Sequence, residues 1–370
     1  MLGGGQRITI CVAKALNQQN IMPHFLIPNE GQLSETLKAS GYSYHLMGDC
    51  SLPLGQKNLT AASRYLKLSI FMLLRAIIIA KKVNPDIIYV SGPAALPWGA
   101  WVGFFTKVPV IWHLHHHFED TKTLMLLNLT ARMAAVKKII SISAYVASQI
   151  VDDSVKQKKI ILYNAVDFVR FSSGQKKIFR DEYNIPESAV VLATIGFLQE
   201  SKRQHLTIET VRILRDKGMD VRGLLVGSIR EDAARYINSL YKLTSEYRLD
   251  KEIIFAGERE DIPNILAGVN AVIVGSIEGL SLVALEAMAA GVPVIGLNEG
   301  GVAEIIHMSN GGVTFDYSDG PRGIAKCVEH VMKNNIYTHL SECAKIFAQK
   351  MAVNKYNDRI IEEFSSIIDK

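Results

Sequence analysis

Residues 275–301 read GSIEGLSLVALEAMAAGVPVIGLNEGG, and no other part of the chain is as informative. A short loop with Glu278 leads into a helix of small residues that carries Glu286 and ends at Gly291. Pro293 opens a strand, and the closing Gly-Gly pair opens another helix. This order of elements is typical of an α/β domain in which parallel strands alternate with covering helices.

The same alternation extends over most of the 370 residues and occurs in two series. We expect buried strands at 21–27, 86–90, 108–114 and 138–142, and again at 189–195, 221–226, 252–255, 271–274, 292–295 and 312–315. We expect helices at 7–16, 62–83, 124–135, 205–217, 262–267 and 323–333. The stretch 168–188 is polar and irregular in pattern, so we place the domain boundary there, between a domain at 1–170 and one at 171–350. The predicted fold class is α/β, with two Rossmann-like doubly wound parallel sheets facing each other across a cleft.

The beginning of the chain departs from this scheme. Residues 1–5, MLGGG, run directly into the helical pattern at 7–16. In a doubly wound domain a glycine-rich loop normally follows the first strand, which is central in the sheet. We therefore expect the first N-terminal strand to be missing, which would leave strand edges exposed.

Composition limits the class of protein. Hydrophobic residues make up 48% of the chain and charged residues 21%, which is typical of a globular protein with a buried core in each domain. The four cysteines, Cys11, Cys50, Cys327 and Cys343, have no metal-ligand spacing and are expected to be reduced thiols of a cytoplasmic protein. No signal peptide is visible, and the apolar run 70–80 is too short to span a bilayer.

The two glutamates of the opening stretch suit a polar ligand. A carboxylate can accept two hydrogen bonds, so each glutamate could hold the vicinal hydroxyls of a sugar. Backbone N–H groups at the start of the helix could meet phosphate oxygens; they belong to Gly279, Leu280, Ser281 and Leu282. This arrangement fits a ligand with a diphosphate at one end and sugar diols around it. The alternative is an acidic loop followed by a carboxylate that interacts with the helix dipole.

The segment resembles the large family of retaining, nucleotide-sugar-dependent glycosyltransferases with the GT-B fold, glycosyl transferases group 1. Their signature is two glutamates with seven residues between them, then a run like EAMAxGxPVI and a GGxxE; here these are Glu278, residues 286–295 and residues 300–304. The resemblance implies that Glu278 contacts hydroxyls of the transferred sugar and that Glu286 holds the nucleotide ribose. It also implies an acceptor domain at 1–170, a donor domain at 171–350, and a C-terminal helix at 351–370 that packs back on the first domain.

Further donor-binding residues follow from the same resemblance. Residues 195–203 contain Gly196 and match the family's loop after the first strand of this domain, with Lys202 at the position of a phosphate-binding basic residue and Arg203 as a second candidate. Phe197 stands where an arginine is common in the family. The alternative interpretation is a solvated basic pair before a helix.

The loop 257–263 resembles the family's base-side loop, so backbone atoms near Arg259 would hold the nucleobase. The same loop could also simply cap a helix, with Asp261 at the N-cap and Pro263 in the first turn, and the two interpretations are compatible.

A histidine run, His113-Leu114-His115-His116-His117, ends a predicted strand. A metal site would need an acidic partner at a fixed spacing, and none is evident. The family often has a histidine here near the sugar and the acceptor, and the resemblance favours His115 for that role. A structural histidine cluster remains the alternative. Gly4 and Gly5 resemble the family's first glycine-rich loop, where the backbone approaches the donor phosphates and the acceptor.

The function implied by the resemblance is transfer of a hexose from a nucleotide diphosphate sugar, of UDP or GDP type, to a glycan or lipid-linked acceptor with retention of configuration, in polysaccharide or glycoconjugate biosynthesis. Glu278, Lys202 and His115 would be the catalytic residues. The chain has no Asp-x-Asp element, so we expect neither a metal nor another cofactor. The alternatives are a nucleotide-sugar 2-epimerase of similar fold and a truncated, non-catalytic nucleotide-binding protein; Phe197 and the missing strand favour the latter.

The net charge of +5 is too small to indicate a nucleic-acid partner, but it favours an anionic substrate or an anionic membrane surface. Residues 62–83 place Lys67, Arg75, Lys81 and Lys82 near apolar side chains. This pattern fits an amphipathic helix on a membrane surface or a core helix with one solvated side. We expect a cytoplasmic protein with peripheral contact to the inner face of the membrane.

Overall fold

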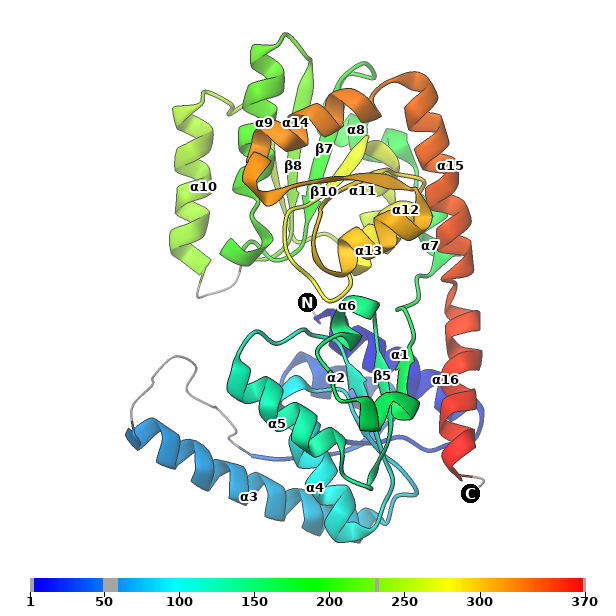
Figure 1. The fold of residues 1–370 in the computed structure, drawn as a ribbon. Coiled ribbons are helices and arrows are strands. Elements are labelled where there is room, and N and C mark those ends of the chain that lie inside the picture. The colour runs from blue at the N-terminus through cyan, green and yellow to red at the C-terminus, as the bar shows by residue number, and fades with distance from the viewer. Residues whose placement is uncertain (1–2, 49–58, 230–232, 369–370) are drawn as a thin grey trace. The chain divides into compact units, whose positions relative to one another are not determined.

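The computed structural model describes residues 3–48, 59–229 and 233–368, and the side chains of 59–67 lie outside this description. The chain divides into two compact units (Figure 1). Unit 1 comprises residues 1–142, 146–162 and 357–370, and unit 2 comprises residues 143–145 and 163–356. The prediction of an α/β fold with parallel sheets is confirmed in both units. The predicted cleft between two domains stays a prediction.

Unit 2 contains one parallel sheet of six strands in the order β12-β11-β10-β7-β8-β9. The strands are β7 (Val190–Ile195), β8 (Val221–Val226), β9 (Ile253–Gly257), β10 (Ala271–Val274), β11 (Val294–Leu297) and β12 (Gly312–Phe315). The strand order is that of a doubly wound sheet, and the winding reverses between β7 and β10. The loops that leave these two strands therefore diverge, and ligands of such sheets bind between them.

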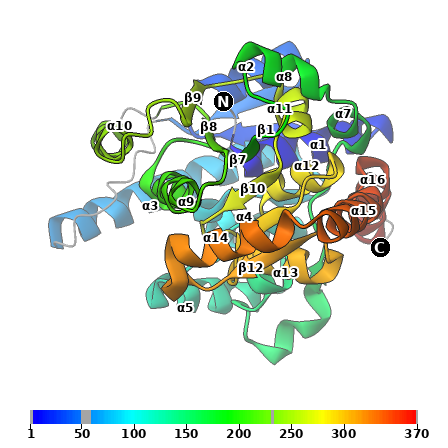
Figure 2. The same ribbon diagram turned by 90° about the horizontal axis from the view of Figure 1, so that it is seen from above.

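Helices cover both faces of this sheet. They are α7 (Phe168–Ser172), α8 (Lys176–Glu182), α9 (His205–Asp216), α10 (Ala234–Glu246), α11 (Ile262–Gly268), α12 (Leu282–Ala289), α13 (Gly300–Ser309), α14 (Gly320–Val331) and α15 (Asn334–Lys350). Helices α9 and α14 pack side by side on one face (Figures 1 and 2). A continuous apolar core of β7, β8, β10, α9, α10 and α14 residues fills the space beneath them.

The prediction that 168–188 is irregular is wrong, because this stretch contains α7 and α8. Asp167 caps α7 by accepting a hydrogen bond from the N–H of Arg170 at 3.1 Å. Helix α8 is short, yet it buries the side chains of Phe179 and Arg180. Tertiary packing of these two side chains thus stabilises a helix that the local sequence pattern does not predict.

Unit 1 contains two separate parallel sheets. One pairs β1 (His24–Ile27) with β2 (Ser43–Leu46), and the other has the order β3 (Ile88–Val90), β4 (Val110–Leu114), β5 (Val136–Ser141), β6 (Lys159–Ile161). The helices are α1 (Gly4–Gln18), α2 (Gln32–Ala39), α3 (Leu59–Val83), α4 (Leu96–Thr106), α5 (Thr121–Ala131), α6 (Ala144–Ala147), shared with unit 2, and α16 (Val353–Ile368), most of which belongs to unit 1. No strand precedes α1 within the described residues. The central position expected for a first strand is therefore not occupied by any described strand, and the two sheets are not joined.

Several side chains attach α16 to the rest of unit 1. Lys138 on β5 donates to Glu363 at 2.9 Å, and the ring of Tyr89 on β3 lies 5.5 Å from that of Phe364. Helices α4 and α5 connect neighbouring parallel strands. Right-handed crossovers therefore place both helices on the face of the sheet opposite to α16 (Figure 1).

Within the described residues, no helix combines the length and the hydropathy needed to cross a bilayer. Cys11, Cys327 and Cys343 are free thiols, and Cys50 lies outside the described residues.

Candidate functional site

The candidate site lies where the winding of the six-stranded sheet reverses. Strand β7 ends at Ile195, and Gly196 follows with φ of +145°, which glycine tolerates best. The chain then forms a short 3₁₀ turn that contains Lys202. Strand β10 ends at Val274, and the loop that follows carries Glu278. The fold therefore brings together two residues that are 76 positions apart in the sequence.

Lys202 and Glu278 form an ion pair. The Nζ atom of Lys202 lies 2.5 Å from Oε1 of Glu278, and the hydroxyl of Ser276 donates to the same oxygen at 2.6 Å. The two charged side chains are 27% and 20% exposed, so both are partly shielded yet accessible to a ligand. An ammonium group has three N–H donors, and this pair uses only one of them. Lys202 is thus oriented by Glu278 while it can still donate to an anion.

The hollow around this pair is formed entirely by unit 2. It is lined by residues from the ends of β7 and β10 and from the start of α12: Thr194, Ile195, Lys202, Ile273, Val274, Gly275, Ser276, Glu278, Ser281 and Val283. Ser281 caps α12, because its Oγ accepts a hydrogen bond from the N–H of Ala284 at 3.3 Å. The positive end of the helix dipole therefore lies beside Lys202 and favours a negatively charged ligand.

The other predicted residues of this segment lie around the same loop. Gly279 and Leu280 lie between Glu278 and the N-cap residue Ser281, and Leu282 is the first residue of α12. Glu286 lies inside α12 and is 5% exposed.

The Gly-Gly pair explains how the Glu278 loop is held. The N–H of Gly301 donates to the carbonyl oxygen of Glu278 at 2.8 Å. A Cβ atom at Gly301 would lie 1.9 Å from the carbonyl oxygen of Gly279, which is far inside van der Waals contact. Gly300 has φ of +76°, which also favours glycine. Only glycines let the start of α13 approach the loop this closely, so the pair positions Glu278.

A second set of contacts supports the same loop from residues that the sequence did not indicate. Ser143 donates to the carbonyl oxygen of Gly279 at 2.6 Å. Glu304 on α13 accepts from the N–H groups of Ala144 and Tyr145, at 2.8 and 3.0 Å, and from the hydroxyl of Tyr163. Burial and this hydrogen bond raise the pKa of Tyr163, so it remains a neutral donor. The final glutamate of the GGxxE run is therefore structural in unit 2.

The two predicted arginines lie at different places. The guanidinium of Arg203 donates to the carbonyl oxygen of Gly275 at 3.0 Å and lies 4.5 Å from the centre of the Tyr317 ring. Arg203 directly follows the turn that contains Lys202, with φ of +55°, and therefore lies beside the candidate site.

Arg259 follows β9 and contacts Glu182 and Asp261. The hydrogen bonds that Arg259 donates to these two carboxylates raise the pKa of Arg259. Its side chain is thus occupied by acidic neighbours, and a contact with a base would come from the backbone of this loop.

His115 and the glycine-rich start of the chain come together in unit 1. His115 follows β4 directly and is 7% exposed, and its ring lies 4.1 Å from that of His113. A Cβ atom at Gly5 would lie 3.7 Å from Cγ of His115, so α1 begins against this ring. The Nε2 atom of His115 is buried and has no hydrogen-bond partner. A buried polar atom without a partner is unusual and suits a ligand contact. Gly4 lies beside Gly5 in the first turn of α1.

We expect His115 to make the stability of unit 1 depend on pH. Burial, and to a smaller extent His116, lower the pKa of His115 to about 4. The unfolded chain binds a proton there below about pH 6.5, whereas the folded chain does not, so stability is lost as the pH falls. H115N should reduce this loss by up to about 1.4 kcal/mol per pH unit between about pH 6.5 and 5. Urea unfolding at several pH values measures it, with exposed His330→Asn as the control; an unchanged slope in H115N would contradict the assignment.

No group of three or more histidine, cysteine, aspartate or glutamate side chains that could hold a metal ion occurs within 3–48, 59–229 and 233–368. The histidine run therefore brings His113 and His115 together without acidic ligands. Instead, Nδ1 of His113 shares a 2.5 Å hydrogen bond with the hydroxyl of Tyr89.

Comparison with known families assigns this architecture. The family described as Glycosyltransferase Family 4 matches residues 2–170, and the family described as Glycosyl transferases group 1 matches residues 189–334. The chain thus contains two matched glycosyltransferase domains, and it has the GT-B fold.

Individual relatives are distant. The putative glycosyltransferase YtcC of Bacillus subtilis is 25% identical over 236 residues, which are 60% of this chain and 57% of YtcC. The capsular polysaccharide biosynthesis glycosyltransferase CapM of Staphylococcus aureus is 24% identical over 310 residues, 80% of this chain and 79% of CapM. The chain spans about half the length of the curated relatives that it matches first.

Among solved structures, Anabaena HepE in complex with UDP superimposes with a TM-score of 0.82 at 20% identity, covering 98% of this chain and 96% of HepE. HepE has also been solved with UDP-glucose. At this level of identity the likeness shows the fold.

Proposed function

We propose that this protein transfers a hexose from a nucleotide diphosphate sugar to a glycan or lipid-linked acceptor, with retention at the anomeric carbon. The observation that carries the proposal is the Lys202–Glu278 pair beside the capped start of α12, at the reversal point of the sheet. A cation and a helix N-terminus suit the diphosphate, and an oriented carboxylate suits the sugar hydroxyls. The complex of HepE with UDP-glucose supports a donor of the UDP type.

The chemistry needs stabilisation of a leaving group. The bond between the anomeric carbon and the diphosphate oxygen breaks, and the bond to the acceptor oxygen forms on the same face of the sugar. The acceptor proton passes to the departing phosphate. Negative charge grows on the diphosphate, where Lys202 and the first amides of α12 would stabilise it. Glu286 would hold the ribose, and His115 would donate or accept a hydrogen bond near the reacting centre.

We propose that the reaction requires no divalent ion, since Lys202 supplies positive charge at the diphosphate. We also propose a cytoplasmic location. The acceptor is expected to belong to cell-surface polysaccharide or glycoconjugate synthesis, a proposal supported by the name of CapM.

The test is a panel of UDP and GDP sugars, with and without candidate acceptors, in which nucleoside diphosphate release and sugar products are both measured. We expect acceptor-dependent release of one nucleotide, a product with the anomeric configuration of the donor, and no loss of rate with a chelator. Isomerisation of the donor without acceptor would instead indicate the 2-epimerase. If no nucleotide or nucleotide sugar raises the melting temperature, the donor site itself is wrong.

A further inference from the structure

Helix α4 in unit 1 packs in an unusual direction. Its small residues face the sheet: a Cβ atom at Gly99 would lie 2.3 Å from the Val90 side chain, and one at Gly103 would lie 2.3 Å from that of Val110. Its large aromatic residues, Trp101, Phe104 and Phe105, face away from the sheet and are 39%, 56% and 52% exposed. Their rings contact one another with centroids 5.4 to 6.0 Å apart. Such an exposed aromatic cluster is costly in water and marks an interaction surface.

The neighbouring helix α3 continues this surface. It packs on α4 through a small core that contains Ala76 and Val102. On its exposed side, four large apolar residues at helical spacing form one stripe: Ile70, Phe71, Leu74 and Ile78, each at least half exposed. Helix α3 is apolar on the side that packs on α4 and also on the exposed side. Packing in the core accounts for the apolar residues of the first side only.

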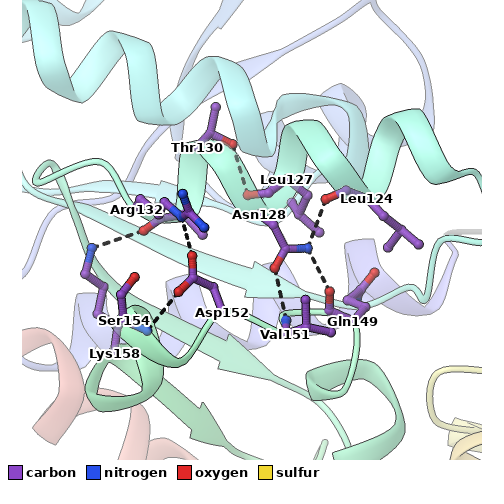
Figure 3. Close-up of polar contacts among 11 residues, drawn as sticks. Leu124, Leu127, Asn128, Thr130, Arg132, Gln149, Val151, Asp152, Ser154 and Lys158 are labelled. Carbon is purple, nitrogen blue, oxygen red and sulfur yellow. Dashed lines mark hydrogen bonds and ion pairs between the residues drawn. The ribbon is translucent and has the colours of Figure 1, made fainter.

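Helix α5 flanks α4 on the other side and repeats the pattern. It exposes Met125, Leu126 and Leu129 on one face, at 73%, 41% and 57%. Its opposite face is fixed by polar contacts with the segment that follows β5 (Figure 3). The side-chain amide of Asn128 donates to the carbonyl of Gln149 at 2.9 Å and accepts from the N–H of Val151 at 3.0 Å.

The C-terminal end of α5 is held in the same way. Lys158 donates to the carbonyl of Ala131 at 3.0 Å, and Arg132 pairs with Asp152. The exposed apolar face of α5 is therefore attached to a well-anchored helix.

The charged residues of these three helices indicate which kind of partner the surface binds. Helices α3, α4 and α5 contain no aspartate or glutamate, whereas α3 and α5 contain basic residues. Exposed Arg75, Lys81 and Lys82 border the apolar stripe of α3, and exposed Lys122 lies on the apolar face of α5. The side chain of Lys67 lies outside the described residues. Lysine is depleted in protein interfaces, whereas lysines beside aromatic and aliphatic residues suit the headgroup region of an anionic membrane.

We propose that the exposed apolar and basic surface of α3, α4 and α5 docks unit 1 on an anionic phospholipid bilayer. The aromatic cluster of α4 enters the boundary between headgroups and acyl chains, and the lysines contact lipid phosphates. This proposal does not depend on the proposed transferase activity, because vesicle binding is measured without donor or acceptor. It would place a lipid-linked acceptor beside the enzyme if that activity is confirmed.

The test is sedimentation of the full chain with phosphatidylcholine vesicles, with and without phosphatidylglycerol, at low and high salt. We expect binding only to the anionic vesicles and weaker binding at high salt. K81Q/K82Q should bind more than tenfold more weakly, since each lysine near an anionic surface contributes roughly fivefold. F104S/F105S should also lose about tenfold or more. All four side chains are exposed, so unfolding curves of the variants should match that of the wild type.

Matched controls lie on the exposed surface of unit 2. Ile346→Ser changes an apolar residue on α15 that is 55% exposed, and K350Q/K355Q removes two exposed lysines. These variants should bind vesicles like the wild type. Equal binding to neutral and anionic vesicles, or equal losses in test and control variants, would overturn the proposal.

Tryptophan fluorescence reports the depth of insertion. Of the three tryptophans, Trp101 is exposed, Trp98 on the same helix is half-buried, and Trp112 is fully buried. Lipids brominated on the acyl chain should quench the emission of the wild type on anionic vesicles, and W101F should lose most of this quenching. Quenching that is absent in the wild type, or unchanged in W101F, would show that α4 does not enter the bilayer and would also overturn the proposal.

Discussion

Replacing Lys202 by alanine should lower kcat for sugar transfer by about 10²–10³-fold, because the variant loses the cation that stabilises charge growing on the leaving diphosphate. The ammonium group is already oriented by Glu278 at 2.5 Å, so little reorganisation opposes its action in the transition state. The interaction strengthens as the leaving group gains charge, so kcat should fall more than the affinity for the donor. Initial rates at saturating donor and acceptor, together with calorimetric donor affinity, separate the two effects.

Lys217 provides the matched control for this substitution. It forms an ion pair of similar length, 2.6 Å to Glu329, on the exposed surface of unit 2. Lys217→Ala should leave kcat within about twofold, and neither variant should lose more than about 1 kcal/mol of unfolding free energy, since both pairs retain access to solvent. A fall in kcat of less than about threefold in K202A would remove Lys202 from the phosphate site.

The meeting of Lys202 and Glu278 illustrates what the sequence could predict. Each residue follows a strong apolar strand, and the doubly wound order brings the ends of these strands together. The sequence does not predict that these two side chains pair directly, because each charge could equally well contact only a ligand. The contact of Gly5 with His115 likewise joins two separately predicted features.

Other supports of the site leave no local signal. Ser143 and Tyr163 contact Gly279 and Glu304 across more than 130 positions of sequence, through single hydrogen bonds without any periodic pattern. Helix α8 was missed for a related reason. Its seven residues are too few to show helical periodicity, and it is stabilised by burial of side chains against distant parts of unit 2.

The most important of those side chains is Arg180, and its replacement by alanine should lower the free energy of unfolding of unit 2 by about 3–5 kcal/mol. Arg180 is only 2% exposed. It donates to the carbonyls of Gly268, Pro186 and Ala189 at 3.0, 2.7 and 3.1 Å, and to the side chain of Asn270 at 3.0 Å. Alanine would leave the buried carbonyls of Gly268 and Ala189 without this donor, and Pro186 and Asn270 would each lose one of their two donors.

The position of Arg180 extends the effect to the whole sheet. Asn270 also accepts a hydrogen bond from the N–H of Val191, so one side chain links the amino ends of β7 and β10 to α8. These are the two strands whose opposite ends carry Lys202 and Glu278. A looser register there would displace the paired charges, so R180A should also weaken donor binding although Arg180 is remote from the ligand.

Arg215 is a control that tests whether burial, and not only the number of hydrogen bonds, determines the loss of stability. It too donates to backbone carbonyls, those of Arg248 and Tyr247 at 2.8 and 3.2 Å, but its side chain is 33% exposed. Water can replace it, so R215A should cost less than about 1 kcal/mol. Calorimetric melting should show a decrease of about 10 °C for R180A and little change for R215A. Equal decreases would mean that Arg180 stabilises α8 through its aliphatic packing, and that its buried hydrogen bonds do not hold the strands that carry the site.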